Sequence, residues 1–287
     1  MKRDLAREIR NAAVRRREGE AYYWCLPLHA VRELASEFDS STAAVSLRAL
    51  ENGFVPERYL KNAGTIGLEG QAALLRSTVL VVGAGGIGGH AVELLARMGV
   101  GRIKVADRDV FDETNLNRQE FSAEDLLGFP KVDVARDRVL AINSDVSVAP
   151  FQLEVSRENI AGLLEEVDAV IDALDNLDDR LMLQEACQLH GVVMVHGAIA
   201  GTSLQATTVF PGDPGLPVFA PSAGGDGKTR GIEVETGNPA TTPAISAAVQ
   251  VQEALSVLLG RTPALRGRML YLDLEDWSVE FIDLGER

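Results

Sequence analysis

The sequence predicts an α/β protein built on a doubly wound, mostly parallel β-sheet, with a C-terminal antiparallel extension and a small N-terminal helical appendage. Three patterns support this prediction. A run of apolar residues enters a glycine-rich turn and then a helix within residues 78–101. Strand patterns then alternate with helix patterns as far as residue 196, which is typical of parallel sheets. After residue 201 the apolar period becomes two, which predicts antiparallel strands.

The glycine-rich turn joins four β-favouring apolar residues, 79–82, to a helical pattern. Gly83 permits a tight turn, Gly85 lets backbone N–H groups approach a phosphate, and Gly88 lets the helix pack closely on the strand. Gly86 stands between them, where a helix N-terminus offers unpaired donors to an anion. The strand–turn–helix context predicts a Rossmann-like nucleotide site, and a purely structural βαβ turn is the alternative.

We expect residues 1–56 to form a small helical appendage. Its first 20 residues are charged and favour a solvated helix. Residues 27–37 and 41–52 predict two short helices with helix-turn-helix spacing, which suits either a DNA-reading module or a simple packing unit. On the second helix only Arg48 is placed to reach a base. We therefore favour an appendage that packs on the main domain or on a partner, and do not expect DNA binding.

The main domain is expected to span residues 57–287. The stretch 211–242 is rich in Gly and Pro, and a loop of this length in a compact domain is usually functional or mobile. The other elements after the glycine turn are predicted as helices over 131–143, 157–166, 178–190 and 244–259, and as strands over 102–106, 146–151, 169–173, 192–196, 203–210, 269–274 and 278–283.

Polar side chains gather at the ends of the predicted strands or in the loops that follow, where open α/β sheets bind ligands. Asp107 ends one strand, where a carboxylate can hold ribose hydroxyls. Arg118 and Lys131 indicate a larger negative charge, such as a triphosphate. Asp175 ends a later strand and suits Mg²⁺, which prefers one or two carboxylates together with phosphate oxygens. The full set is Asp107, Asp109, Asn115, Arg118, Gln119, Lys131 and Asp175.

The composition restricts partners and compartment. The net charge of −14 opposes nonspecific binding to nucleic acid or anionic lipid. No apolar run reaches the roughly 20 residues of a membrane helix, and the basic N-terminus lacks the apolar centre of a secretory signal. Cys25 and Cys187 are the only cysteines, too few for a disulfide framework or a four-thiolate zinc site. We expect a cytoplasmic protein with no zinc and no membrane partner.

Several segments together resemble the MoeB/ThiF/HesA family, the bacterial relatives of ubiquitin-activating enzymes. They lie roughly between residues 57 and 283 and include RYLKNAGTIGLEGQAALL, the glycine turn, ADRDVFDETNLNRQ, GFPKV, ALDN and TTPAISAAVQVQEAL. The resemblance implies an enzyme that uses ATP and Mg²⁺ to adenylate a small ubiquitin-like sulfur-carrier protein ending in Gly-Gly, for molybdopterin, tungstopterin or thiamine synthesis. The carrier's terminal carboxylate would attack the α-phosphate and release pyrophosphate. Attack of one anion on another needs charge neutralisation and in-line positioning rather than a strong base.

The same resemblance implies roles for individual residues. Gly85 and its neighbours lie against the phosphate and ribose, and Asp107 takes the ribose hydroxyls. The phosphates are contacted by Asn115, Arg118 and Lys131. The metal is held or oriented by Asp175.

Two departures from the family pattern affect the expected chemistry. Lys61 stands where relatives place an arginine that often reaches the partner subunit's phosphates, which implies a homodimer; lysine keeps the charge but loses the bidentate fork. Many relatives carry two CxxC pairs for zinc and a cysteine in the crossover loop, whereas this chain has no cysteine after Cys187. The loop over 211–242 therefore has no thiol nucleophile, and we interpret Cys187 as a buried packing residue. A separate sulfur donor is then expected.

Three other functions fit parts of the sequence. A related ATP-dependent enzyme could activate a tRNA base or a short peptide, although the net charge opposes tRNA. A nucleotide-sensing regulator could bind DNA through the N-terminal helices. An NAD-dependent oxidoreductase would leave Arg118, Lys131 and Asp175 unexplained.

Overall fold

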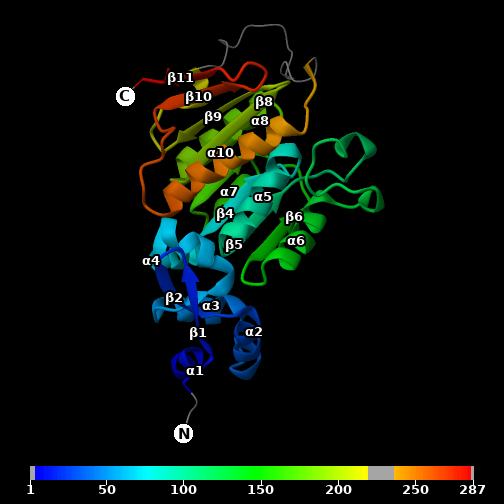
Figure 1. Cartoon of the computed structure of the whole chain (residues 1–287). Helices are drawn as coiled ribbons and strands as arrows, with labels where there is room; N and C mark the ends of the chain where they lie inside the picture. Colours follow the sequence, from blue (N-terminus) through cyan, green and yellow to red (C-terminus); the bar gives the residue numbers. More distant parts are fainter. Residues whose placement is uncertain (1–3, 219–235, 286–287) are drawn as a thin grey trace.

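The computed structural model describes residues 4–218 and 236–285, and it confirms the predicted α/β architecture (Figure 1). Within these residues the main sheet has eight strands in the order β11-β10-β9-β8-β7-β4-β5-β6. The neighbours from β8 to β6 run parallel, and β9, β10 and β11 are added antiparallel, as the change of period predicts. The strands are β4 (Thr78–Val82), β5 (Arg102–Ala106), β6 (Ser147–Phe151), β7 (Ala169–Asp172), β8 (Val193–Ala200), β9 (Ser203–Val209), β10 (Arg268–Asp273) and β11 (Val279–Asp283).

Helices cover both faces of the main sheet, as a doubly wound fold requires. On β4, Val79 and Val81 join one apolar cluster and Leu80 joins the other, because successive side chains of a strand point to opposite faces. One face is covered by α5 (Gly86–Met98), α6 (Lys131–Ile142) and α10 (Thr241–Leu258), and the other by α7 (Ile160–Leu164) and α8 (Leu177–His190).

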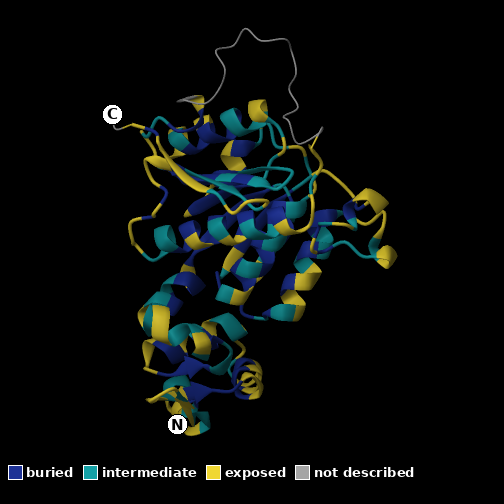
Figure 2. Ribbon diagram, turned by 45° about the horizontal axis from the view of Figure 1, so that its top comes forward, coloured by how far each residue is buried: buried dark blue, intermediate teal, exposed yellow. Residues whose placement is uncertain are grey.

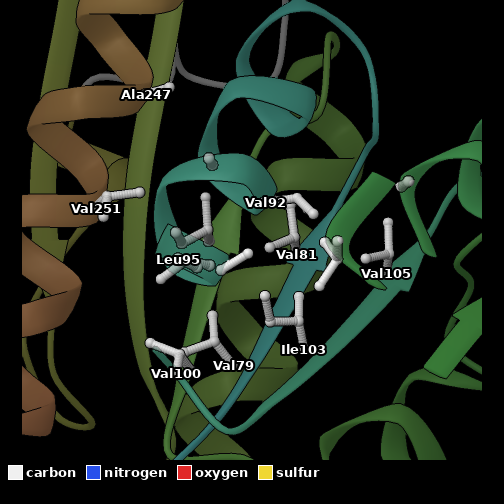
Figure 3. Close-up of a cluster of buried hydrophobic side chains, with 14 of the residues drawn as sticks. Val79, Val81, Val92, Leu95, Val100, Ile103, Val105, Ala247 and Val251 are labelled. Atoms are coloured by element: carbon white, nitrogen blue, oxygen red, sulfur yellow. The ribbon is translucent and has the colours of Figure 1, made fainter. Parts of the chain in front are cut away.

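The first of these clusters fixes α5 against the sheet. Figure 3 shows Val79 and Val81 with Leu95 of α5, while Val251 of α10 approaches from the side. Burying one such aliphatic side chain contributes about 1.5–3 kcal/mol. The glycine turn between β4 and α5 is therefore held from both sides by well-packed elements, which keeps its backbone donors in place.

The N-terminal region differs from the single charged helix expected over residues 1–20. The helix α1 (Leu5–Ala12) is short, and the chain continues as a hairpin of β1 (Val14–Glu18) and β2 (Ala21–Leu26). The arginine-rich β1 is stabilised by aromatic side chains across the hairpin: the Arg15 guanidinium lies 4.1 Å from the ring centre of Tyr22. The charged sequence favours a helix over residues 1–20, whereas the observed strand β1 is stabilised by the contact of Arg15 with Tyr22 on β2.

The two short helices expected next are confirmed as α2 (Leu28–Glu37) and α3 (Thr42–Glu51). Ser41 caps α3 by accepting a hydrogen bond from the Ala44 nitrogen, as its residue type favours. A third strand, β3 (Val55–Pro56), pairs with β2 and completes a small sheet in the order β1-β2-β3. The chain then passes through η1 (Glu57–Asn62) into α4 (Ala63–Arg76) and β4.

A buried polar network joins this N-terminal region to the main domain. The Asp145 carboxylate accepts hydrogen bonds from the Ser46 hydroxyl of α3 at 2.8 Å and the Tyr59 hydroxyl at 3.3 Å. Asn143 donates to the same Tyr59 oxygen at 2.9 Å. Figure 2 shows buried residues continuing from this region into the main domain. These contacts confirm that α3 packs on the main domain, and Arg48 is paired with Glu51.

Most element boundaries agree with the sequence pattern to within a few residues. The larger differences are α7, predicted over 157–166 and observed over Ile160–Leu164, and β8, predicted over 192–196 and observed over Val193–Ala200. The loop over 211–242 falls partly outside the described residues, which omit 219–235. In the described part of the chain, we find no helix that combines the length and the apolar character needed to span a membrane. The domain boundary at residue 56 stays a prediction.

Candidate active site

The glycine turn has the geometry that its sequence predicts. Gly83 has a φ of +94°, and a Cβ atom there would lie 2.5 Å from the carbonyl oxygen of Ala173. A Cβ on Gly88 would lie 1.8 Å from the oxygen of Gly83. Both positions therefore require glycine for the packing of the turn itself.

Gly85 differs from these two glycines because packing does not exclude a side chain there. The nearest atom to a Cβ at Gly85 would be Nε2 of Gln119, at an ordinary 3.6 Å. Gly85 is also the N-cap of α5, and no side chain caps this helix end. The first backbone N–H groups of α5 are thus available to an anion that approaches over Gly85.

Asp107, at the end of β5, holds the glycine turn directly. Its Oδ2 atom accepts a hydrogen bond from the Ala84 nitrogen at 2.7 Å, and its Oδ1 atom accepts one from the Asp109 nitrogen at 2.8 Å. Each carboxylate oxygen keeps a further lone pair. The side chain is therefore fixed beside the turn and can still accept hydrogen bonds from a ligand, so a ribose contact stays a prediction.

The loop after Asp107 brings a buried cation to the same edge of the sheet. Lys131 begins α6, and its Nζ atom lies 3.1 Å from Oδ2 of Asp109. The Lys131 side chain is only 7% exposed, whereas that of Asp109 is 55% exposed. The ammonium group of Lys131 is therefore largely buried with one partly exposed carboxylate as its partner, and a phosphate contact stays a prediction.

Arg118 and Gln119 complete the edge of the turn. The Cγ atom of Arg118 lies 3.7 Å from the position that a Cβ on Gly86 would occupy, and its Nη1 atom donates to the Thr114 oxygen at 2.8 Å. Gln119 is buried, and within the described residues its Oε1 atom has no hydrogen-bond partner. An unpaired buried acceptor beside Gly85 indicates that a ligand or water supplies the missing donor.

The two cations also act on one carboxylate between them. The pKa of Asp112 is lowered mainly by hydrogen bonds from Thr114, and the charges of Lys131 and Arg118 add to this effect. Both cations therefore act electrostatically on the same loop, and a shared anionic ligand stays a prediction. Asn115 is buried in the same loop, where its amide exchanges hydrogen bonds with Asp112 in a capping box. Asn115 thus shapes the loop, and a direct phosphate contact by its side chain stays a prediction.

Asp175 follows β7 and is exposed at the same end of the sheet. Hydrogen bonding to Glu154 raises the pKa of Arg108, and the negative charge of Asp175 makes a smaller contribution to this increase. In the described parts of the chain no group of three or more His, Cys, Asp or Glu side chains could hold a metal ion. A single exposed carboxylate fits Mg²⁺ only when phosphate oxygens supply the other ligands.

Lys61 lies away from the other predicted site residues of its own chain. Pro243, near the start of α10, packs on Gly86, whereas Arg261, beyond the end of α10, donates to the oxygen of Thr65. The 18 residues of α10 span about 27 Å. Lys61 belongs to η1, close to Thr65 in the chain, so it lies near the C-terminal end of α10, far from the glycine turn at the other end. Its side chain is 79% exposed, and its Nζ atom lies 2.7 Å from a carboxylate oxygen of Glu18.

The sequence analysis missed a buried acid–base pair beside the turn. Asp172 and His196 are register partners on the neighbouring strands β7 and β8, and their Oδ2 and Nδ1 atoms lie 2.7 Å apart. Their relative exposures are 0% and 2%. A polar residue at the end of each of two apolar strands was the available signal, because such a residue must find a partner when it is buried.

The cysteines agree with the packing interpretation. Both are buried, and burial raises the pKa of the Cys187 thiol to about 12. Burial likewise raises the pKa of the Cys25 thiol. Neither thiol has the exposed, electropositive surroundings of a reactive thiolate.

Sequence comparisons identify the family. The ThiF family pattern matches residues 59–287. The chain is 38% identical to the SAMP-activating enzyme E1 of Haloferax volcanii over 76% of this chain and 80% of that protein. It is 36% identical to the sulfur carrier protein ThiS adenylyltransferase of Bacillus subtilis, over 70% of this chain and 60% of that protein. It spans about half the length of the adenylyltransferase and sulfurtransferase MOCS3 of Culex quinquefasciatus, at 36% identity over 72% of this chain and 48% of that protein.

Solved structures show the same fold at lower identity. The microcin C7 biosynthetic enzyme MccB in complex with N-formylated MccA has a TM-score of 0.71 at 19% identity, over 89% of this chain and 80% of that one. PaaA has a TM-score of 0.68 at 22% identity, over 80% of this chain and 74% of that one. The family match and the identity to the Haloferax enzyme show that this chain belongs to the ThiF family of adenylyltransferase enzymes.

Proposed function

We propose that this chain uses ATP to adenylate the C-terminal Gly-Gly carboxylate of a small ubiquitin-like sulfur-carrier protein. The observation that carries the proposal is the glycine turn, uncapped at Gly85, with Arg118 beside Gly86 and with Lys131 linked to the turn through Asp109 and Asp107. Two cations and a free helix N-terminus suit a triphosphate better than the single ribose contact of a dehydrogenase. Relatives named for activating SAMP and ThiS support a carrier of this kind.

The residues of the candidate site would have different roles in the reaction, according to their charge and position. The amide groups of α5 and the two cations hold the triphosphate and neutralise the charge that opposes attack by the carrier's carboxylate. Asp107 fixes the turn and would hold the ribose. Asp175 would hold Mg²⁺ together with phosphate oxygens, and the bound ion would neutralise further charge on the phosphates. No side chain is required as a general base, because the attacking carboxylate is already ionised at neutral pH.

The finer assignments belong to the same proposal. We infer a cytoplasmic homodimer in which Lys61 acts toward the partner subunit, a separate sulfur donor, no zinc, and a MoaD- or ThiS-like carrier for molybdopterin, tungstopterin or thiamine synthesis. DNA is not expected to bind, since Glu33, Glu37 and Glu51 give the two short helices a negative charge.

The test is ATP–pyrophosphate exchange with purified candidate carriers. Exchange should require the complete Gly-Gly terminus and should vanish when the last glycine of the carrier is removed. The Asp175→Ala variant should lose exchange and keep its circular dichroism spectrum, because Asp175 is exposed. Asp178→Ala is the matched control, since Asp178 is an exposed carboxylate three residues away at the start of α8. Exchange with a tRNA or a peptide but with no carrier would refute the proposal.

A further inference from the structure

The pair Asp172–His196 lies inside the protein and cannot exchange protons with a substrate. Both side chains are buried, and burial lowers the pKa of His196 despite the opposing effect of the Asp172 charge. The imidazole is therefore neutral at pH 7. A neutral imidazole donates to a carboxylate only when the nitrogen that faces it carries the proton, so Nδ1 of His196 is the donor toward Oδ2 of Asp172.

The second carboxylate oxygen of Asp172 controls the turn that follows β7. Oδ1 accepts a hydrogen bond from the Leu174 nitrogen at 3.0 Å. The backbone oxygen of Asp172 accepts one from Nε2 of Gln250 on α10 at 2.8 Å. The next nitrogen, that of Ala173, donates to the Val82 oxygen at 2.9 Å. Residues 172–174 are thus fixed from β4, from α10 and from their own side chain.

This turn is shared by two parts of the candidate active site. On one side, Ala173 forms the wall against which Gly83 and Gly88 pack, as their close approaches show. On the other side, the turn leads directly to the exposed Asp175. A change in the 172–174 backbone would therefore move Asp175 relative to the glycine turn.

We propose that His196 is a positioning residue: by holding Asp172, it fixes the 172–175 turn that sets Asp175 against the phosphates of the bound nucleotide. The proposal rests on the proposed function for the role of Asp175, and it assigns His196 no contact with substrate. His196 lies on β8 between its register partners Asp172 on β7 and Thr207 on β9, so the backbone on both sides of it is fixed by the sheet.

The test compares two substitutions of His196 with a control on the next strand. His196→Leu removes the donor and keeps the bulk, whereas His196→Asn keeps an N–H group near the position of Nδ1. Thr208→Val is the control, because Thr208 makes a buried 2.8 Å hydrogen bond to Glu253 and does not touch the turn. The first measurement is hydrogen exchange at the Leu174 amide. The second is Mn²⁺ binding, measured by electron paramagnetic resonance with a non-hydrolysable ATP analogue.

His196→Leu should speed Leu174 exchange and weaken Mn²⁺ binding by about tenfold each, since a hydrogen bond to a charged group is lost. His196→Asn should stay close to wild type in both measurements. Thr208→Val should lower the melting temperature and leave both unchanged. Unchanged Leu174 exchange in His196→Leu would overturn the proposal, as would faster exchange with normal Mn²⁺ binding. Absence of Mn²⁺–nucleotide binding by the wild type would refute the proposed function and the role of Asp175, while Leu174 exchange would still decide whether His196 holds the turn.

Discussion

Oδ2 of Asp107 accepts a hydrogen bond from the backbone nitrogen of Ala84 at 2.7 Å, so the residue that ends β5 also sets the shape of the turn after β4. The same carboxylate binds the Asp109 nitrogen through its other oxygen. Asp109 in turn pairs with Lys131. One acidic side chain thus links the backbone of the glycine turn to the buried cation, and loss of that link should affect both.

Replacing Asp107 by alanine should weaken nucleotide binding by about 10- to 100-fold, because two charge-assisted hydrogen bonds that order the turn are lost. Isothermal titration with an ATP analogue measures this change. Asp107→Asn should fall between alanine and wild type, because its amide oxygen can still accept the Ala84 bond. Equal affinities for all three proteins would contradict a role of Asp107 in ordering the turn.

Replacing Arg118 by alanine should slow carrier-dependent pyrophosphate exchange by about 10²–10³, the usual effect of removing one donor to a charged transition state. Arg118→Lys should recover part of this loss, since it restores the charge without the planar fork. Arg136→Ala is the control, because Arg136 lies on α6 and pairs with Asp133 away from the turn. Wild-type rates in Arg118→Ala would remove this residue from the proposed site.

Mixing the inactive Lys61→Ala and Asp175→Ala proteins should restore exchange if Lys61 acts on the partner subunit. Random reassociation gives heterodimers with one intact site, so we expect about a quarter of the wild-type activity. Sedimentation equilibrium should first show that each variant is a dimer. A monomeric wild type, or no recovery from proven heterodimers, would leave the shared site without support.

The free energy of unfolding should fall as pH decreases through about 6.5, the ordinary pKa of histidine. Burial lowers the pKa of His196 in the folded protein. As pH falls, the unfolded chain therefore binds this proton before the folded protein does, and protonation shifts the equilibrium toward the unfolded state. The contribution is at most about 1.4 kcal/mol per pH unit. Urea unfolding between pH 7.5 and 5 measures it. His196→Asn should show a smaller slope, and parallel curves for the two proteins would contradict this account.

Native Cys187 should react with iodoacetamide at pH 8 about 10³-fold more slowly than a free thiol, because its raised pKa leaves little thiolate. Both cysteines should become reactive in urea. A Cys25→Ala, Cys187→Ala protein should keep adenylation and, with external sulfide, thiocarboxylate formation. A reducible enzyme–carrier adduct in the wild type would show instead that one thiol takes part in the reaction.

The parts of the site that the sequence predicts are those set by neighbours along the chain. The apolar residues 79–82, the glycines after them and the period of α5 define the turn locally, so its strand–turn–helix geometry could be predicted from the sequence. The carboxylate at the end of β5 was found for the same reason. Lys131 was predicted from its charge and from the resemblance of its segment, GFPKV, to the family. Its pairing with Asp109 depends on how the loop over 107–130 folds.

The parts that the sequence did not predict depend on distant pairing. Asp172 and His196 meet only because β7 and β8 are neighbours in the sheet. The helix predicted over residues 1–20 is wrong for β1, because Arg16 and its neighbours suit either structure. Only the aromatic residues opposite, together with the ion pair of Arg16 with Glu57, select the strand.

The buried network around Tyr59 has a consequence for how this protein is divided. The family match begins at residue 59, inside η1, so Tyr59 belongs to the shared domain. Its ring nevertheless packs in one cluster with Cys25, Leu50 and Val55, all of which precede the match. A chain cut at the family boundary would expose this cluster and leave the Asp145 carboxylate without Ser46. In this protein the segment that matches the family pattern is therefore smaller than the unit that packs together.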